Sequence, residues 1–279
     1  MTAAALAANL EAWCGGSGAM AQEQAPALPP CGGKVIAQGA ARHVIDANTF
    51  TLDDDREVRL AAIEVPPLGA GAAPGGAAAK AALDALIGGD AVVLRSADIA
   101  TDRYGRVVAY VSAVRDGEEI FAQGEMLAAG FARAGDRVDS RACAAELFRR
   151  EDAARQAKLG LWANSYYQVL AAEAPADVLA QRGRFALVQG KVVSVHESGA
   201  TIYVNFGRRW SEDFSVTVQK RNERNFAAAG LDVKALAGRL VRVRGVIEQR
   251  GLRGSPSIEA QRPEQIETAD LDNDRVTQQ

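Results

Sequence analysis

The chain has 279 residues, of which 48% are hydrophobic and 24% are charged, as is usual for a globular protein of about two domains. No apolar run approaches the roughly twenty residues that a membrane-spanning helix needs, so the sequence predicts no such helix.

The net charge of -3 conceals an uneven distribution. Residues 183–262 carry 14 Lys and Arg against 7 Asp and Glu, whereas the rest of the chain carries 18 basic and 28 acidic residues. A basic region indicates a polyanionic partner such as nucleic acid. The alternative is a solvated surface that is simply rich in arginine.

The N-terminus predicts an exported protein. Residues 1–21 are rich in Ala and Leu and end in Ala19-Met20-Ala21, a pattern that signal peptidase cuts. The stretch lacks a basic start and is interrupted by Glu11, so we expect a secretory remnant, with a disordered tail as the alternative. Residues 22–33 are rich in Pro and Gly and indicate a linker. We expect a periplasmic or secreted protein, or otherwise a cytoplasmic one.

The first half of the chain has the periodicity of strands followed by helices. Apolar and β-branched residues near period two predict strands within 34–63, at 92–94 and at 107–111, and helical spacing predicts helices over 77–87, 118–132 and 139–159. Residues 164–182 indicate a connector that is partly helical around 175–181.

The strand pattern returns in the basic half. Strands are predicted at 185–196, 201–206, 214–218, 239–248 and 256–260, with a helix at 222–229 and a further turn at 233–236. Three strands, a helix and two strands is the order of an OB-fold, a small barrel that often binds oligonucleotides. Residues 269–279 are polar and are expected to fray.

Two arginines at strand edges indicate an anion site. Arg59 lies in the strand pattern 57–60, and Arg106 ends the turn motif Asp102-Arg103-Tyr104-Gly105-Arg106. A guanidinium can donate two parallel hydrogen bonds to phosphate oxygens, so two converging arginines suit a phosphate. The alternatives are ion pairs of Arg59 with Asp46 or Glu64, and of Arg106 with Asp102.

These motifs resemble the staphylococcal nuclease family over residues 34–163. The resemblance rests on Val44-Ile45-Asp46-Ala47-Asn48-Thr49, on Arg59 to Pro66, on the turn motif around Tyr104, and on Leu159-Gly160-Leu161-Trp162. It implies a mainly β fold, with a nuclease-type barrel of five strands and about three packed helices. Residues 183–268 resemble the OB-type domains of some bacterial nuclease-like proteins, chiefly through 203–210, and imply a second five-stranded barrel.

The resemblance also implies a site, from which parts are missing. Arg59, Glu64 and Arg106 match catalytic positions of the family, Asn48 and Glu64 match its calcium ligands, and Tyr104 matches its nucleotide pocket. Asparagine lacks the charge of the family's aspartate, so we expect calcium binding to be weak or absent. Pro67 occupies the position of the general base and cannot accept a proton.

Three functions follow from these residues. The first is a nuclease-fold protein that binds single- or double-stranded nucleic acid and is catalytically impaired. The alternatives are an active calcium-dependent endonuclease, in which Glu57 or Glu64 would replace the lost base, and a periplasmic structural or protein-binding module. Nucleic-acid contacts in the basic half are predicted for a set of cationic and aromatic residues: Arg208, Arg209, Trp210, Lys220 and Arg221.

The cysteines predict one disulfide. Cys14 precedes the expected cleavage site, which leaves Cys31 and Cys143 as a pair in an exported protein. We expect a bond between them that fastens the linker to the last helix of the nuclease-like region. The alternative is two free thiols in a cytosolic protein.

Overall fold

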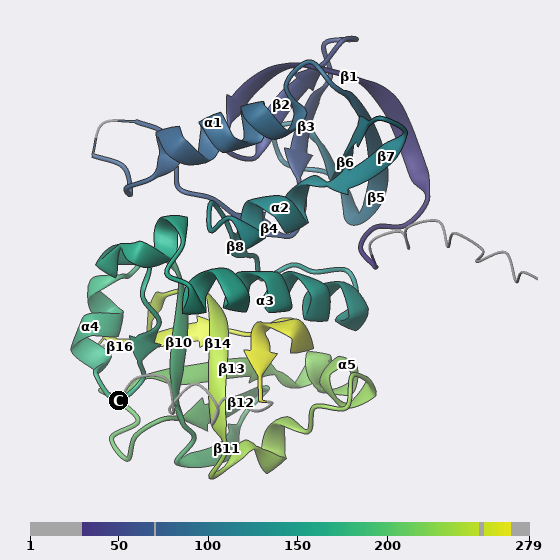
Figure 1. Cartoon of the computed structure of the whole chain (residues 1–279). Coiled ribbons are helices and arrows are strands. Elements are labelled where there is room, and N and C mark those ends of the chain that lie inside the picture. The colour runs from purple at the N-terminus through teal and green to yellow at the C-terminus, as the bar shows by residue number, and fades with distance from the viewer. Residues whose placement is uncertain (1–29, 70, 251–253, 269–279) are drawn as a thin grey trace, which may run out of the picture.

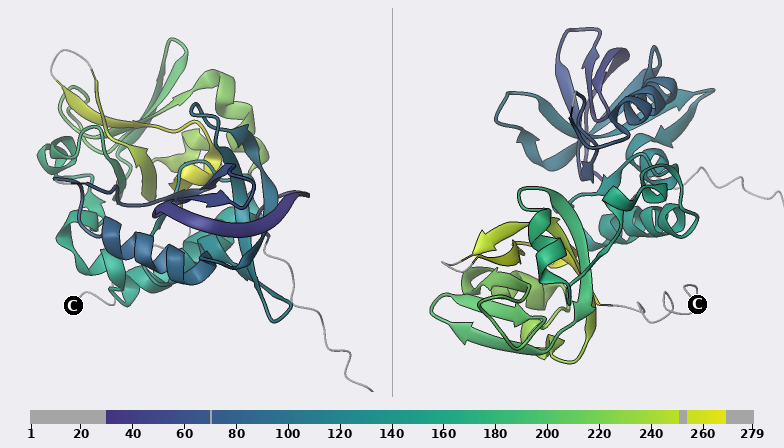
Figure 2. Two further views of the ribbon diagram at one scale, coloured as in Figure 1. Left: turned by 90° about the horizontal axis from the view of Figure 1, so that it is seen from above. Right: turned by 90° about the vertical axis from the view of Figure 1, so that its left-hand side faces the viewer.

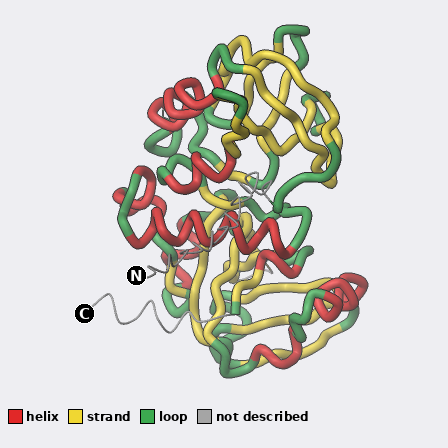
Figure 3. The backbone as a smooth tube through the Cα atoms, turned by 45° about the vertical axis from the view of Figure 1, so that its right-hand side comes forward, coloured by secondary structure: helices red, strands yellow, loops and turns green. Residues whose placement is uncertain are grey.

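The computed structural model describes residues 30–69, 71–250 and 254–268 (Figure 1). The expected secretory remnant, most of the linker and the C-terminal tail lie outside these residues. Figure 1 shows two barrels, one above the other, with helix α3 (Arg141–Gln156) between them. The right-hand view in Figure 2 also keeps the barrels apart, and Figure 3 shows their two groups of strands with helices alongside. In the described part of the chain, no helix has the length and apolar character to cross a membrane.

The first barrel is a ring of five strands with a sixth at its side. Its order is β3-β2-β1-β5-β6-β7, and a parallel pairing of β3 with β6 closes the ring. Because side chains alternate between the two faces of a strand, Phe50, Leu94 and Val111 all point inward and share one core. The strands are β1 (Val35–Asp46), β2 (Thr49–Leu52), β3 (Glu57–Leu60), β5 (Ala91–Thr101), β6 (Val107–Arg115) and β7 (Glu118–Phe121).

The helices of this barrel agree with the sequence except at one place. They are α1 (Gly76–Ile87), α2 (Ala122–Ala128) and α3, and a small pair of strands, β4 (Ile63–Glu64) and β8 (Arg133–Ala134), adjoins them. The expected helix over 118–132 is too long at both ends, because residues 118–121 form β7 and α2 ends at Ala128. Asp116 and Gly117 both have positive φ and form the tight turn that folds β7 back onto β6.

The second barrel has the strand and helix order expected of an OB-like fold. Bends at residues 192–193 and at 247 divide two of the expected strands and place their halves in two sheets, β11-β12-β13-β16-β15 and β17-β14-β10-β9. Val188, Val216, Phe226 and Ile258 belong to its core. Its elements are β10 (Phe185–Lys191), β11 (Ser194–Ser198), β12 (Thr201–Asn205), β13 (Ser215–Gln219), α5 (Glu223–Ala228), β14 (Leu240–Val246), β15 (Glu248–Arg250), β16 (Ser255–Glu259) and β17 (Ile266–Glu267).

The connector over 164–182 is part of the second barrel rather than a free link. Its strand β9 (Leu170–Ala171) pairs in parallel with β10, and its helix α4 (Pro175–Ala180) buries Val178 in the second core. Short 3-10 turns complete the chain at Gly160–Ala163, Ser165–Tyr167, Lys220–Asn222, Val233–Leu236 and Pro263–Gln265.

A disulfide joins Cys31 to Cys143, with the two sulfurs 2.04 Å apart. This is the pairing that the sequence analysis expects. Both residues are completely buried in the first core, so the chain around Cys31 belongs to the barrel and not to a linker. The bond fastens this segment to the first turn of α3, where the Ser140 side chain caps the helix by accepting from the Cys143 N–H.

Candidate functional site

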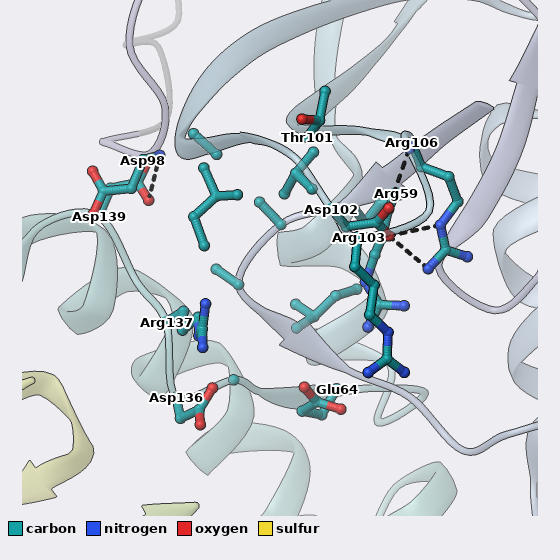
Figure 4. Close-up of a pocket in the computed structure, with 18 of the residues that line it drawn as sticks. Arg59, Glu64, Asp98, Thr101, Asp102, Arg103, Arg106, Asp136, Arg137 and Asp139 are labelled. Carbon is teal, nitrogen blue, oxygen red and sulfur yellow. Dashed lines mark hydrogen bonds and ion pairs between the residues drawn. The ribbon is translucent and has the colours of Figure 1, made fainter. Parts of the chain in front are cut away.

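A pocket of about 580 Å³ opens on the first barrel at the edge that faces the second (Figure 4). Its walls carry as many arginines as acids, so its net charge is balanced. The charged lining residues are Arg59, Arg103, Arg106, Arg137 and Arg262, with Glu64, Asp98, Asp102, Asp136 and Asp139.

The fold brings the two predicted arginines into this pocket. Arg59 lies opposite Thr49 in the β2–β3 ladder and opposite Val108 in the β3–β6 ladder. Arg106 directly precedes β6, and its Nη1 donates to Thr49 Oγ1 at 3.4 Å. The closed ring therefore places both arginines next to Thr49, one through the strand ladder and one through its guanidinium group, although 47 positions separate them in the chain.

Arg106 is held by the turn motif that contains it. Its Nε donates to Asp102 Oδ2 at 2.7 Å, and the backbone N–H groups of Tyr104 and Arg106 donate to Asp102 Oδ1. Burial would raise the pKa of Asp102, but these hydrogen bonds outweigh it and lower the pKa. The ion pair considered for Arg106 is thus present, and it orients the guanidinium without removing it from the pocket.

Arg59 has a different partner from those considered. No carboxylate lies within ion-pair distance of it in the described residues. When the amide of Asn48 is oriented so that both its atoms find partners, Asn48 Oδ1 accepts from Arg59 Nη2 at 3.3 Å, and its nitrogen donates to Asp46 Oδ1 and Thr49 Oγ1. The charge of Arg59 is therefore not neutralised by a neighbour and remains available to an anion.

These contacts do not fit a calcium ion. Calcium takes six to eight oxygen ligands, several of them carboxylates. Of the two predicted ligands only Glu64 is a carboxylate, and the oxygen of Asn48 faces a guanidinium instead of a metal position. The described residues contain no group of three or more His, Cys, Asp or Glu side chains placed to hold a metal.

Glu64 lies in the wall of the pocket, on β4 opposite Arg133 of β8. Burial raises the pKa of Glu64 above its usual range; the charge of Arg59 opposes the shift, and that of Asp136 adds to it. Pro67, three residues further along the chain, is exposed and does not line the pocket that holds Arg59 and Arg106, which is called the arginine pocket from here on. The position expected for the general base therefore lies outside the pocket as well as carrying the wrong residue.

Tyr104 lies at the rim, with 67% of its surface exposed. The guanidinium carbons of Arg103 and Arg106 lie 4.7 and 5.1 Å from the centre of its ring, and Arg103 Nη2 donates to its hydroxyl at 2.6 Å. The ring is thus fixed beside the arginines, where a nucleotide base could stack on it.

Three further arginines line the pocket that the sequence did not predict there. Arg103 belongs to the same turn motif and could have been found there. Arg137 follows β8 and extends into the pocket from the side opposite Arg59 and Arg103 (Figure 4). Arg262 comes from the second barrel, where it donates to Asp98 Oδ2 at 2.6 Å and to the Val138 carbonyl at 3.3 Å. No local pattern marks Arg262 as a neighbour of the pocket.

The residues predicted to contact nucleic acid in the second barrel do not line this pocket. Arg209 is paired with Glu212 at 2.7 Å, and Lys220 with Glu197 at 2.5 Å. Trp210 is 75% exposed beside the first of these pairs.

A different group of residues gathers on the β11–β12 sheet. There the rings of His196 and Tyr203 stack with centres 5.0 Å apart, and the guanidinium of Arg250 lies 4.6 Å from the Tyr203 ring.

A comparison with protein families identifies the first barrel. No curated protein matches the chain. The family model described as staphylococcal nuclease homologue matches residues 57–164, which include the β3 arginine, the turn motif and α3. Together with the closed five-strand ring and the pair of arginines beside Thr49, this match shows that the chain contains a staphylococcal nuclease-like domain.

Proposed function

We propose that this protein binds nucleic acid through the arginine pocket and cleaves it poorly or not at all. The observation that carries the proposal is that Arg59 lies opposite Thr49 in the strand ladder and Arg106 donates to the Thr49 hydroxyl, with Arg59 free of any carboxylate partner in the described chain. Two fixed guanidinium groups attract and orient a phosphate. Tyr104 at the rim supports a ligand that carries a base.

Catalysis is expected to be impaired for two independent reasons. Pro67 replaces the base, and loss of a positioned base costs about two to four orders of magnitude in rate. The Asn48 oxygen faces Arg59, so the charge that would hold a divalent cation is missing. Both losses affect the same step and need not add. Glu57 is exposed on the strand of Arg59 and does not line the pocket, whereas Glu64 lies in the pocket wall with a raised pKa and is the remaining candidate for a base.

The basic second barrel supports a nucleic-acid partner, although less strongly than its charge suggests. Arg242 and Arg244 are completely enclosed at the contact between the barrels, so their charge is not offered to a ligand. The stack of His196, Tyr203 and Arg250 remains on the β11–β12 sheet and combines aromatic and cationic groups. The buried disulfide is consistent with an oxidising compartment and favours a periplasmic or secreted protein.

The test measures binding and cleavage together. Fluorescently labelled single- and double-stranded DNA and RNA are titrated with the protein, in calcium and in a chelator. We expect binding without calcium, a steep loss with rising salt, and at least about tenfold weaker binding in Arg59→Gln and Arg106→Gln. Arg42→Gln is the matched control, because Arg42 lies on β1 and pairs with Asp55 at the surface.

Two outcomes favour the alternatives. Calcium-dependent cleavage that disappears in Arg59→Gln indicates an active endonuclease. An absence of binding at low salt indicates a protein-binding module. Conversely, Asn48→Asp combined with Pro67→Glu should gain calcium-dependent cleavage if the impairment has the stated causes.

A further inference from the structure

A second cavity lies between the two barrels, on the far side of Glu64 from the arginine pocket. Its volume is about 340 Å³, and it shares only Glu64 with that pocket. The first barrel contributes Pro66, Pro67 and Arg133, while the chain that leads into the second barrel contributes Tyr166, Tyr167 and Arg184, among others. In Figure 1 the segment that precedes α1 and the segment between α3 and α4 lie on the same side of the molecule.

Arg133 is a cation without an ion-pair partner among the described residues. Its guanidinium lies between two aromatic rings, 5.1 Å from the centre of Tyr167 and 5.0 Å from that of Phe185. Its Nη1 donates to the Phe185 carbonyl at 3.0 Å, and no carboxylate of the described residues lies within 4.0 Å. Burial lowers the pKa of Arg133, and the charges of Glu151 and Glu64, neither of them at ion-pair distance, oppose this shift without cancelling it. An enclosed charge without a counter-ion is costly, so an anion in the cavity would be stabilised.

Arg184 adds a second guanidinium. It lies 4.8 Å from the ring centre of Tyr166 and donates through Nη1 to the Gln181 side chain at 3.1 Å, with no carboxylate partner in the described chain. Tyr166 in turn meets Tyr167 edge to face at 4.8 Å. The Tyr167 hydroxyl donates to the Pro74 carbonyl at 2.6 Å, which fixes that ring between the barrels.

The composition of the lining defines the ligand. Glu64 is the single acidic residue among the cavity's lining residues, against two arginines, and three aromatic rings complete the walls. This combination suits a ligand with one anionic group and one flat ring. The volume is at the lower end for small-molecule sites, which corresponds to a single nucleotide and excludes a helical duplex.

We propose that this cavity binds a nucleoside monophosphate, with the phosphate at Arg133 and Arg184 and the base against the tyrosine rings. The ligand is either a free nucleotide or the terminal nucleotide of a strand that carries a 5′-phosphate, since both present the same groups. The site is separate from the arginine pocket and does not depend on the function proposed for it.

The test uses isothermal titration of the full chain with AMP, CMP, GMP and UMP, and with adenosine and inorganic phosphate. Nucleotides should bind, and adenosine and phosphate should each bind at least about tenfold more weakly, because each makes only part of the contacts. Arg184→Gln and Tyr166→Leu should each weaken nucleotide binding by about tenfold or more. Arg182→Gln is the matched control, because Arg182 lies two residues away, outside the cavity, and donates to Gln249.

A double variant, Arg59→Gln with Arg106→Gln, separates the two sites. It should lose binding of long single strands and keep binding of AMP. Thermal unfolding of each variant verifies that it is folded. Competition of AMP with a 5′-phosphorylated oligonucleotide, and not with its 5′-hydroxyl form, identifies a strand end as the source. Competition with neither form identifies the free nucleotide.

The proposal is overturned if no nucleotide binds the wild type at millimolar concentration. It is equally overturned if adenosine binds as tightly as AMP, or if AMP binding survives in Arg184→Gln and disappears in the double variant.

Discussion

Arg244 of β14 and Glu151 of α3 are both completely buried and form an ion pair of 2.9 Å between the two barrels. Arg244 also donates to Glu267 at 2.6 Å and to the Ala134 carbonyl at 2.8 Å, and its guanidinium lies 3.8 Å from the Phe148 ring centre. Glu151 accepts in turn from the Ala134 N–H at 2.8 Å. The two domains are therefore joined by an enclosed polar network, and the cavities between them have walls held from both sides.

Removing one member of this pair should destabilise the protein strongly. In Glu151→Ala, Arg244 keeps Glu267 but loses its other counter-ion in a dry environment, and a broken buried pair costs about 3–5 kcal/mol. The free energy of unfolding from urea titration measures this. Arg149→Ala is the control, because Arg149 lies exposed on the same helix and its pairing with Glu146 contributes about 0–1 kcal/mol. Equal losses in the two variants would contradict the network's role.

Reduction of the disulfide should also lower stability. The bond closes a loop with a sequence separation of 112 residues, for which the chain-entropy account predicts about 4–5 kcal/mol. The double variant Cys31→Ser with Cys143→Ser should have a free energy of unfolding lower than that of the oxidised wild type by that amount, and its urea midpoint should be lower. Reductant should shift the wild type to the same midpoint and leave the variant unchanged. If the wild type is unfolded and refolded in reductant and its urea midpoint does not change, this expectation is wrong.

Glu64 should link stability to pH. Burial raises its pKa most, Arg59 opposes the shift, and Asp136 adds to it. The folded protein then keeps this proton to higher pH than the unfolded chain does. The free energy of unfolding should therefore decrease as the pH rises from the ordinary glutamate pKa through the raised one. Glu64→Gln should remove this decrease.

The same substitution should strengthen phosphate binding above the raised pKa of Glu64, because there it removes a negative charge from the pocket wall. Urea and phosphate titrations between pH 4 and 8 measure the two effects. Glu57→Gln, an exposed carboxylate on β3, serves as the control for the loss of one charge. A stability profile of Glu64→Gln that parallels the wild type would exclude Glu64 as the linked group.

In the second barrel, Tyr203 should contribute more to single-strand binding than Trp210. Arg250 covers the Tyr203 ring without a carboxylate partner in the described chain, whereas Arg209 beside Trp210 is paired with Glu212. Loss of a base-stacking ring costs about 1–3 kcal/mol. Polarisation titrations with a labelled oligothymidylate should thus show the larger loss in Tyr203→Leu than in Trp210→Leu. A larger loss in Trp210→Leu would instead indicate that the segment 208–210 contacts the nucleic acid.

Much of the fold could be predicted because its signals are local. Period-two alternation predicted most strands. The turn motif Asp102 to Arg106 indicated an arginine with a fixed orientation, because the aspartate that holds Arg106 lies only four residues before it. The helix expected at 118 failed for a local reason too, because the Asp116-Gly117 turn makes residues 118–121 a strand. The approach of Arg59 to Arg106 was predictable only through the family's barrel, which closes β3 onto β6.

The sequence by itself determined the order of most strands and helices along the chain, the two arginine motifs and the proline at position 67, because these depend on residue identity and short-range spacing. Only the tertiary structure decided which charges are available. Arg244 and Arg262 both read as basic surface in the sequence, yet one is enclosed by Glu151 and the other meets Asp98, 164 positions away. Arg133 lies unmatched between two rings for the same reason. The partner of a charge depends on how barrels pack, and burial, not composition, decides whether that charge is neutralised, hidden or offered to a ligand.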